Sequence, residues 1–436
     1  ATPVLGAFTT TGRAVGEEAF TLASPTSTST AVFKLESSDE SVARFSKVNG
    51  KLSIVGAGKT TITASQPAND DYLAATKNFV LTVRKGTPVL TATADASSTF
   101  GEVGPTIAKP TSESRGAITF ASGNPAVATI NATNGQVAVV GAGTSTITVT
   151  QAATDDYVSA TQTLTFTVKQ ATPTLGKLTI DAKTFGDAGF TVEKPTSSSS
   201  GAFTFTSSNS KIIKISEAGK ATIEGAGTAT ITATQAAAGN YAANSVTADI
   251  TVAKGTPELS NISLTGLVFG DADTTMAPRS TSTGAFTFSS NNARVVTVNE
   301  TTGRVRIVGA GTATITVRQA STTNYEAASS SVTVQIGLAT PAFQRLDPIE
   351  KEFGDPTFLF NWGTSPSDGT ITYESTDPTK ATIHPSTGRV TIVNVGTTTL
   401  KMKQGVGSNH KATEIVVVLT ISRGLPVYGD FVIANK

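Results

Sequence analysis

The chain of 436 residues is too long for one hydrophobic core, since a domain averages about 150 residues, and several domains are expected. Charged residues make up only 15% of it, and 33 Lys and Arg nearly cancel 32 Asp and Glu. This balance excludes long-range attraction to nucleic acid or to an anionic membrane. The absence of cysteine excludes disulfides, thiolate nucleophiles and Cys-ligated metal sites. No apolar stretch approaches the ~18 to 20 residues of a membrane helix, so no membrane insertion is expected.

A repeat with a period of 84 or 85 residues runs through the whole chain. A Thr-Pro or Leu-Pro dipeptide marks each copy, with its proline at Pro3, Pro88, Pro173, Pro257, Pro341 and Pro426. An apolar residue followed by glycine comes after each of the first five prolines, at Val15, Phe100, Phe185, Phe269 and Phe353. Such self-similarity indicates one folding unit per period. It predicts five repeats at 1–85, 86–170, 171–254, 255–338 and 339–423, and the first strand of a sixth at 424–436.

In chain order within repeat 2, a Gly-Ala-Gly segment, 141–143, separates two runs that alternate in polarity. The run 136–140 leads into it, and the run 146–150 leads out with Ile147 and Val149 on one side. This pattern predicts a β-hairpin whose glycines supply the positive φ angles of the turn.

The last strand of repeat 2 shows the same period of two, with Leu164, Phe166 and Val168 predicted to point inward. No window shows a sustained apolar stripe with the period of a helix. Six or seven short antiparallel strands in about 85 residues are typical of an immunoglobulin-like sandwich. The predicted fold class is therefore all-β, a tandem array of five immunoglobulin-like β-sandwich domains.

Three segments of repeat 2 resemble a known family. The segments 119–130, 139–144 and 147–151 are similar to the bacterial Ig-like repeats (the BIg group, Big2 type) of large surface proteins. The resemblance extends over all five repeats and is weakest in the fifth. Such repeats are found in invasin- and intimin-like proteins, giant adhesins and phage virion proteins, and as spacers in secreted enzymes. The resemblance implies the sandwich fold, and for function a range of structural and adhesive roles.

The repeats follow one another with almost no linker. Only Lys85, Gly86 and Thr87 separate the last predicted strand of repeat 1 from Pro88. Proline fixes φ and biases the residue before it toward extended geometry. Long strands of ~10 residues at ~3.3 Å per residue make a domain roughly 35 to 40 Å long, and five domains roughly 170 to 200 Å. A semi-rigid, elongated rod is therefore expected.

The segment from Leu425 to Phe431 aligns with that from Thr2 to Phe8. It is interpreted either as the stub of a longer array or as a donor strand for the open sheet of a neighbouring subunit. Repeat 1 already has its own first strand and offers no vacant groove, which favours the stub.

Two pairs of aspartates near loop tips suggest calcium, which binds through carboxylate and carbonyl oxygens. They are Asp70 and Asp71 in repeat 1, and Asp155 and Asp156 in repeat 2. Later copies have no carboxylate at these positions, so a calcium site in repeats 1 and 2 is weighed against a solvated turn. No other cofactor is expected.

Three kinds of residue recur at the repeat period and point to structural roles shared by every copy. The glutamines are Gln66, Gln151, Gln235, Gln319 and Gln404. The aromatic residues are Tyr72, Tyr157, Tyr241, Tyr325 and His410. The acidic residues after each apolar-glycine pair are Glu17, Glu102, Asp187, Asp271 and Asp355. We expect each glutamine to satisfy loop groups and each tyrosine to plug the sandwich end with its hydroxyl bonded to backbone, with ligand binding by all five copies as the alternative. Each acid is expected to cap a turn, with an interdomain ion as the alternative.

Repeat 5 contains the chain's single tryptophan, Trp362, in an aromatic cluster. Aromatic side chains concentrate binding energy, so Trp362 is a candidate for stacking on a sugar, with an end cap or interdomain contact as the alternative. Both histidines, His384 and His410, also lie in repeat 5, and nothing ties them to a serine and an aspartate as a catalytic triad requires.

The sequence favours a non-catalytic function as a stalk or spacer of a bacterial cell-surface or secreted adhesin. The expected location is extracellular. The alternatives are a carbohydrate-binding module in repeat 5 and a structural protein of a phage virion. The expected partners are neighbouring domains of the same long chain and a cell-surface glycan or protein receptor.

Overall fold

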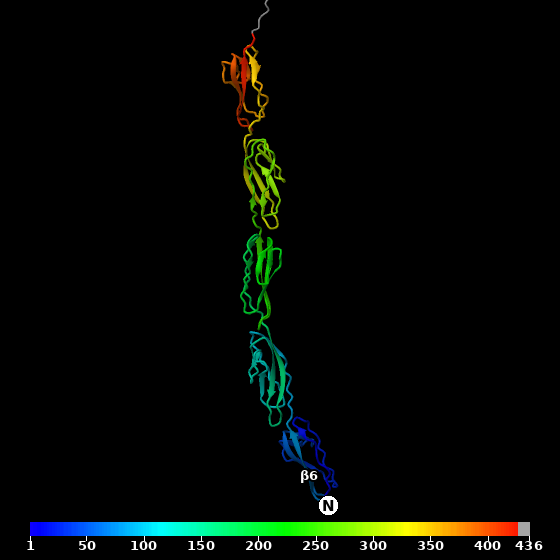
Figure 1. The fold of residues 1–436 in the computed structure, drawn as a ribbon. Coiled ribbons are helices and arrows are strands. Elements are labelled where there is room, and N and C mark those ends of the chain that lie inside the picture. Colours follow the sequence, from blue (N-terminus) through cyan, green and yellow to red (C-terminus); the bar gives the residue numbers. More distant parts are fainter. Residues whose placement is uncertain (426–436) are drawn as a thin grey trace, which may run out of the picture.

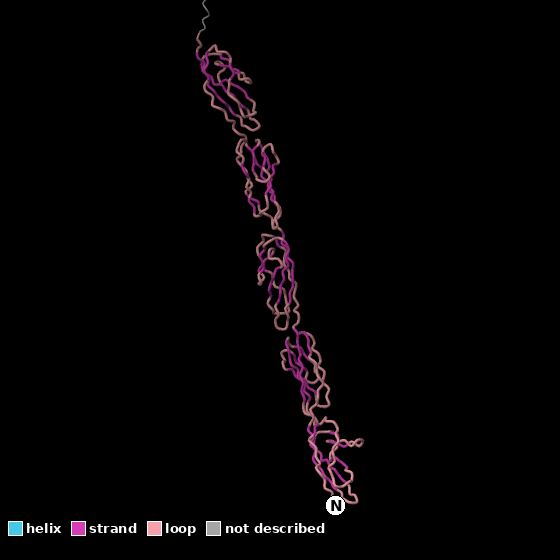
Figure 2. Tube along the Cα trace, turned by 90° about the vertical axis from the view of Figure 1, so that its right-hand side faces the viewer, coloured by secondary structure: helices cyan, strands magenta, loops and turns pink. Residues whose placement is uncertain are grey.

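The computed structural model describes residues 1–425, so the predicted first strand of a sixth repeat lies, beyond Leu425, outside the described residues. Figure 1 shows five small domains that follow one another end to end as an elongated rod. Strands and loops make up all of the described part, as Figure 2 shows. Among residues 1–425 no helix has the length and apolar character needed to cross a membrane. We call the end of each domain nearer residue 1 proximal, and the other end distal.

Repeat 3 shows the architecture of each domain, which is two sheets packed face to face. One sheet has the strand order β13-β19-β18-β15 and the other β14-β17-β16. The first strand pairs in parallel with the last, Lys183 opposite Val252, and the remaining pairs are antiparallel. This order is that of an immunoglobulin-like sandwich. The other repeats keep it, with some strands reduced to single bridges.

The strands of the five repeats have the following bounds. Repeat 1 has β1 (Arg13–Ala14), β2 (Lys34–Ser37), β3 (Ala43–Phe45), β4 (Leu52–Ile54), β5 (Gly58–Gln66) and β6 (Ala75–Arg84). Repeat 2 has β7 (Ala96–Thr99), β8 (Ile118–Ser122), β9 (Ala128–Ile130), β10 (Val137–Val139), β11 (Gly143–Gln151) and β12 (Ala160–Lys169). Repeat 3 has β13 (Lys183–Thr184), β14 (Phe190–Thr191), β15 (Phe203–Ser207), β16 (Ile213–Ile215), β17 (Lys220–Ile223), β18 (Gly227–Gln235) and β19 (Asn244–Ala253).

Repeat 4 has one more short pair of strands than the others. Its strands are β20 (Leu259–Ser260), β21 (Thr274–Thr275), β22 (Arg279–Ser280), β23 (Phe286–Ser290), β24 (Val296–Val298), β25 (Arg304–Ile307), β26 (Gly311–Gln319) and β27 (Ala328–Ile336). Repeat 5 has β28 (Ile349–Glu352), β29 (Phe358–Leu359), β30 (Ile371–Ser375), β31 (Ala381–Ile383), β32 (Arg389–Ile392), β33 (Gly396–Gln404) and β34 (Thr413–Ser422).

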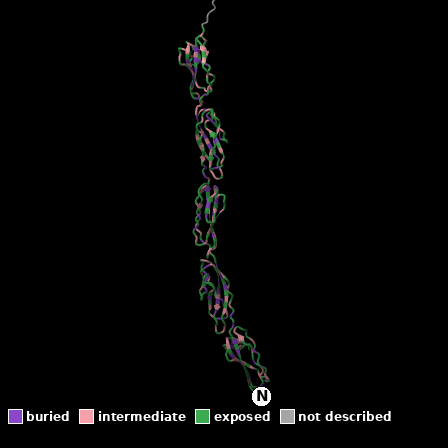
Figure 3. Ribbon diagram, viewed as in Figure 1, coloured by how far each residue is buried: buried purple, intermediate pink, exposed green. Residues whose placement is uncertain are grey.

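Each repeat has its own hydrophobic core between its two sheets, seen as buried segments inside each domain in Figure 3. The alternation predicted in repeat 2 is confirmed: Ile147, Val149 and Phe166 have no exposed surface, and the threonines between them face outward. Since successive side chains of a strand point to opposite faces, the Thr-rich face meets water while the branched apolar residues fill the core.

The hairpin predicted around 141–143 is wrong. Strand β10 pairs with β9 in one sheet, whereas β11 pairs with β8 and β12 in the other. The glycine segment therefore carries the chain across the sandwich from one sheet to the other. Alternation on both sides of a glycine turn is the same for a hairpin and for such a crossing, because both strands must present one apolar face. We call this segment of each repeat, with its counterparts 56–58, 225–227, 309–311 and 394–396, the glycine turn.

One buried glutamine per repeat holds the loop between the second and third strands of the immunoglobulin order. In repeat 3 the Gln235 amide donates to the carbonyls of Ser199 (3.0 Å) and Gly201 (2.8 Å), and its Oε1 accepts from the Ser197 hydroxyl (2.6 Å). The same pair of donated bonds is made by Gln66, Gln151, Gln319 and Gln404. The predicted role of these glutamines is confirmed.

The acidic residue after each apolar-glycine pair caps a tight turn, as predicted. In repeat 3 the Asp187 carboxylate accepts from the Thr184 backbone N–H at 2.8 Å, while the Asp187 N–H donates to the Thr184 carbonyl. The carboxylates that make the equivalent bond are Glu17, Glu102, Asp271 and Asp355.

Candidate functional site: the junctions between repeats

The residues that recur most regularly meet where one repeat touches the next. The turn between the last two strands of each repeat lies at its proximal end, and we call it the docking turn; its residues are 69–72, 154–157, 238–241, 322–325 and 407–410. At each of the four junctions the docking turn of one repeat contacts the glycine turn of the repeat before it. The junctions are the narrow points between domains in Figure 1.

A single hydrogen bond of constant geometry joins the two turns at every junction. At the junction of repeats 3 and 4, the backbone N–H of Ala226 donates to Oδ1 of Asn324 at 2.9 Å. The equivalent bonds run from Ala57 to Asp156 (2.8 Å), from Ala142 to Asn240 (2.8 Å) and from Ala310 to Asn409 (2.7 Å). We call this bond the turn lock. It needs one side-chain oxygen at a fixed place, which Asp and Asn supply equally.

The first glycine of each locked turn is required by the partner repeat as well as by its own. A Cβ on Gly225 would lie 2.6 Å from the Lys211 carbonyl oxygen and 3.2 Å from Oδ1 of Asn324. The glycines at this position of repeats 1 to 4 are all buried; they are Gly56, Gly141, Gly225 and Gly309. The close approach of two backbones is what a glycine permits, so the Gly-Ala-Gly sequence is also a docking surface.

Backbone bonds fix the connecting segment beside the turn lock. At the junction of repeats 3 and 4, Gly255 donates to the carbonyl of Asn324 (2.9 Å) and accepts from the N–H of Glu326 (2.9 Å). The same pair of bonds occurs at the other three junctions, around Gly86, Ala171 and Ala339. The connecting segment thus pairs with the next domain as a short strand, which explains why so short a linker gives a stiff connection.

An aromatic pair closes three of the four junctions. The ring of Phe185 meets Tyr325 edge to face at 5.2 Å between centroids, and Phe100 meets Tyr241 at 5.7 Å. At the junction of repeats 4 and 5 the partner of Phe269 is His410, at 5.4 Å. Such pairs contribute about 0.5 to 1.5 kcal/mol beyond the area that they bury. The prediction that each tyrosine bonds backbone through its hydroxyl is wrong for these residues, because the ring packs across the junction instead.

The four aspartates proposed for calcium lie in the docking turns of repeats 1 and 2. Oδ1 of Asp156 is the acceptor of the first turn lock, and the backbone carbonyl of Asp71 accepts from the amino group of Ala1 at 2.9 Å. No group of three or more His, Asp or Glu side chains within residues 1–425 is arranged to hold a metal ion. A calcium role for Asp70, Asp71, Asp155 and Asp156 stays a prediction.

Trp362 packs against the core of repeat 5 rather than at a junction. Its indole N–H donates to the Tyr373 hydroxyl at 2.7 Å, and its ring meets Phe343 edge to face at 6.0 Å. The single polar atom of the side chain is therefore bonded within the repeat. The ligand-binding role of Trp362 stays a prediction.

Both histidines have places in the scaffold. His410 stacks at the last junction, and Nδ1 of His384 lies 3.3 Å from the backbone nitrogens of Ser386 and Thr387, closing a turn where repeat 4 has Asn299. Immunoglobulin-like repeats of this kind are typically non-catalytic.

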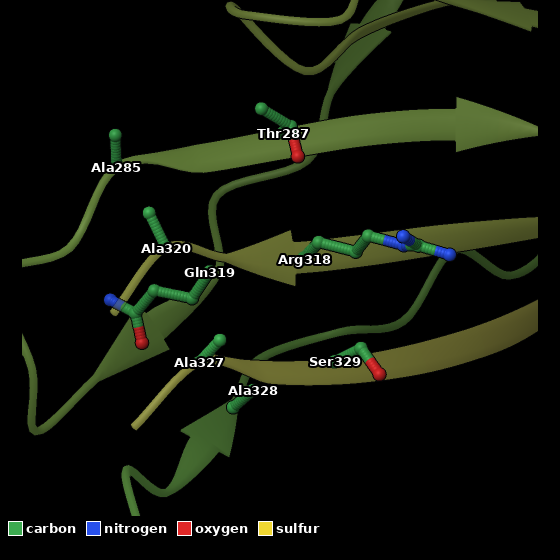
Figure 4. A pocket seen from close by; sticks show the side chains of 8 residues that line it. All are labelled: Ala285, Thr287, Arg318, Gln319, Ala320, Ala327, Ala328 and Ser329. Carbon is green, nitrogen blue, oxygen red and sulfur yellow. The ribbon is translucent and has the colours of Figure 1, made fainter. Parts of the chain in front are cut away.

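A shallow depression lies on the solvent face of repeat 4, over β23, β26 and β27 (Figure 4). Its lining is mostly small, with Ala285, Ala320 and Ala327 beside Arg318. Gln319 reaches it too, but both ends of the Gln319 amide are bonded to the loop described above. The depression therefore has no buried polar group left to orient a ligand.

The docking turn of repeat 5 is held by a carboxylate, whereas an asparagine or threonine side chain holds it in repeats 1, 2 and 4. Asp368 accepts from the backbone N–H of Ser408 at 2.8 Å and from its hydroxyl at 2.6 Å. These bonds, the hydroxyl bond first, hold the pKa of Asp368 below its ordinary value of 3.8. The neighbouring Asn409 is thereby positioned for the last turn lock.

Comparison with known proteins places three repeats in one family. The model of the intimin immunoglobulin-like domain matches residues 104–153, 187–237 and 274–321, roughly a third of the chain. These matches fall in repeats 2, 3 and 4. No curated protein matches the chain significantly.

Among solved structures, the chain is similar to several multidomain proteins at low identity. Drosophila N-cadherin EC1-4 is 12% identical over 76% of this chain and 100% of that chain, with a TM-score of 0.21. Sidekick-1 immunoglobulin domains 1-5 are 12% identical over 97% and 98%, with a TM-score of 0.23. The insect immune protein hemolin is 14% identical over 77% and 100%, with a TM-score of 0.26. At these scores the likeness carries no further argument.

The strand order common to the five domains and the family match of the three central repeats lead to one conclusion. The chain is a tandem array of immunoglobulin-like repeats, three of which are similar to the immunoglobulin-like domain of intimin.

Proposed function

We propose that this chain is a stiff stalk in a bacterial cell-surface or secreted adhesin, where it holds a binding region away from the cell. The observation that carries the proposal is the turn lock, which is made four times in series with donor to acceptor distances of 2.7 to 2.9 Å. A chain that served only to link domains would need no such bond. The match to the intimin domain supports the surface location and a protein or glycan receptor beyond the stalk.

Stiffness follows from several contacts at each junction: the turn lock and the paired connecting segment at all four, and the aromatic pair at three. At the junction of repeats 3 and 4 the docking turn and Glu326 make all three contacts, and these reach three separate segments, around Phe185, Ala226 and Gly255, so that a tilt of the docking turn strains more than one contact. Each contact alone contributes only about 1 kcal/mol. Nearest-neighbour coupling of this kind lets the length of the array grow by repetition without loss of direction.

Small-angle X-ray scattering of the full chain tests the proposal. A stiff stalk should give the cross-section of a single sandwich and a maximum dimension of roughly 170 to 200 Å. A matched variant without the four lock acceptors, D156A/N240A/N324A/N409A, should keep the circular dichroism of folded sandwiches and give a shorter average length. A compact particle from the unaltered chain, or an unchanged length in the variant, would contradict the stalk model.

Glycan-array binding by the full chain separates the stalk from the carbohydrate-binding alternative. A stalk gives no binding above that of an unrelated immunoglobulin-like array. Binding that is lost in W362A would instead assign repeat 5 as a carbohydrate-binding module.

A further inference from the structure

The glycine turn of repeat 5 differs from the other four at the two positions that make the lock. Asn394 stands where repeats 1 to 4 have a buried glycine, and Val395 stands where they have alanine. The course of the chain is unchanged, since Gly396 has φ of 130°, close to the 134° of Gly311. The amides of Val393 and Asn394 also donate to the Lys380 carbonyl, as their counterparts in repeat 4 do to Val295.

The side chain of Asn394 takes the place of the missing partner. Its Oδ1 accepts from the N–H of Val395 at 2.9 Å. This N–H is the counterpart of the one on Ala310, which at the previous junction donates to Oδ1 of Asn409 at 2.7 Å. Repeat 5 therefore satisfies its own turn, and a backbone N–H that already has a well-placed acceptor gains little from a second.

Steric fit opposes the lock as well. In the four locked turns, a Cβ on the glycine would lie 2.9 to 3.3 Å from the incoming Oδ1. Asn394 carries that Cβ and a carboxamide beyond it, in the space where the partner oxygen would enter. The stacking ring, by contrast, is retained: Phe353 corresponds to Phe269 and is 51% exposed.

We propose that Asn394 determines which repeat ends can be coupled, because its carboxamide closes the lock site at the distal end of repeat 5. A sandwich placed against this end would be held by the chain connection and the Phe353 ring but not by a turn lock. The run of locked junctions then ends at repeat 5 because of Asn394. The inference deepens the proposed stalk function, but it rests on the junction geometry and stands even if the stalk role is wrong.

The test places an asparagine at position 309, in the glycine turn of the locked junction between repeats 4 and 5. Since the 436 residues contain no cysteine, spin labels at T333C and T391C report the distance between repeats 4 and 5. G309N should broaden that distance distribution as much as N409A does. G309A supplies the Cβ without the carboxamide and should broaden it less. A distribution in G309N that stays as narrow as in the parent, or an equal effect of G309A, would overturn the proposal.

Hydrogen exchange in repeat 5 gives a second measurement, which does not depend on whether the G309N variant folds. The Val395 amide should exchange about fivefold faster in N394G than in the parent chain, after correction for intrinsic rates, because one hydrogen bond is lost. Equal rates would show that Asn394 does not cap its own turn. Scattering by the full chain, which tests the stalk, is independent of both results.

Discussion

Removing one side-chain oxygen at the junction of repeats 3 and 4 should loosen that junction alone. Asn324→Ala deletes the acceptor that lies 2.9 Å from the Ala226 N–H and leaves the backbone bonds around Gly255 in place. The lock is partly buried, so the net loss is that of one ordinary hydrogen bond, about 0.5 to 1.5 kcal/mol. A loss of ~1 kcal/mol lowers the ratio of docked to undocked junctions about fivefold.

Pulsed electron–electron double resonance between spin labels at K214C and T333C measures the ratio of docked to undocked junctions directly. The docked peak of the distance distribution should lose weight to a broad component in N324A, while the circular dichroism stays unchanged. Asn291→Ala is the matched control, because Oδ1 of Asn291 accepts from the Thr314 N–H at 2.7 Å within repeat 4. It should destabilise repeat 4 by a similar amount and leave the distance distribution as it was. An identical distribution in N324A and the parent would refute the turn lock as the source of stiffness.

Three further outcomes are expected. Gln235→Leu leaves two partly buried carbonyls and a serine hydroxyl without their partners, and should cost roughly 2 to 4 kcal/mol of unfolding free energy in chemical denaturation. Tyr373→Phe removes the hydrogen bond to Trp362 and should cost about 1 kcal/mol by calorimetry, and it should cost less than this when Trp362→Phe has already removed the bond. The pKa of Asp368 is lowered in the folded chain, so its contribution is present above the ordinary value of 3.8 and is lost as pH falls through the lower folded value. The docking turn of repeat 5 should therefore loosen only below about pH 4, measured by amide exchange at Ser408, and D368N should abolish that pH dependence.

The sequence was sufficient to predict the repeat, the sandwich and the role of the buried glutamines. Each of these depends on local pattern: the period of two places Ile147 and Phe166 in the core, and recurrence marks Gln235 and its counterparts as structural. Such patterns can be recognised within one repeat and do not depend on its contacts with neighbouring repeats.

The residues of the junction were also visible as recurring motifs, but their role was not. The change from the carboxylate of Asp156 to Asn240 counted in the sequence only against a calcium site shared by all copies. In the structure both residues serve one role, because the lock uses a single oxygen that either side chain provides.

Periodicity by itself determined that every copy uses these residues for the same purpose. It left undecided whether a recurring residue meets its own repeat or the next, since both give the same period. Only the tertiary structure decided this, by bringing Ala57 to Asp156 across 99 positions of the chain. The same limit explains the mistaken hairpin: alternation fixes which face of a strand is buried, whereas the sheet that the strand joins is chosen by packing between the two layers.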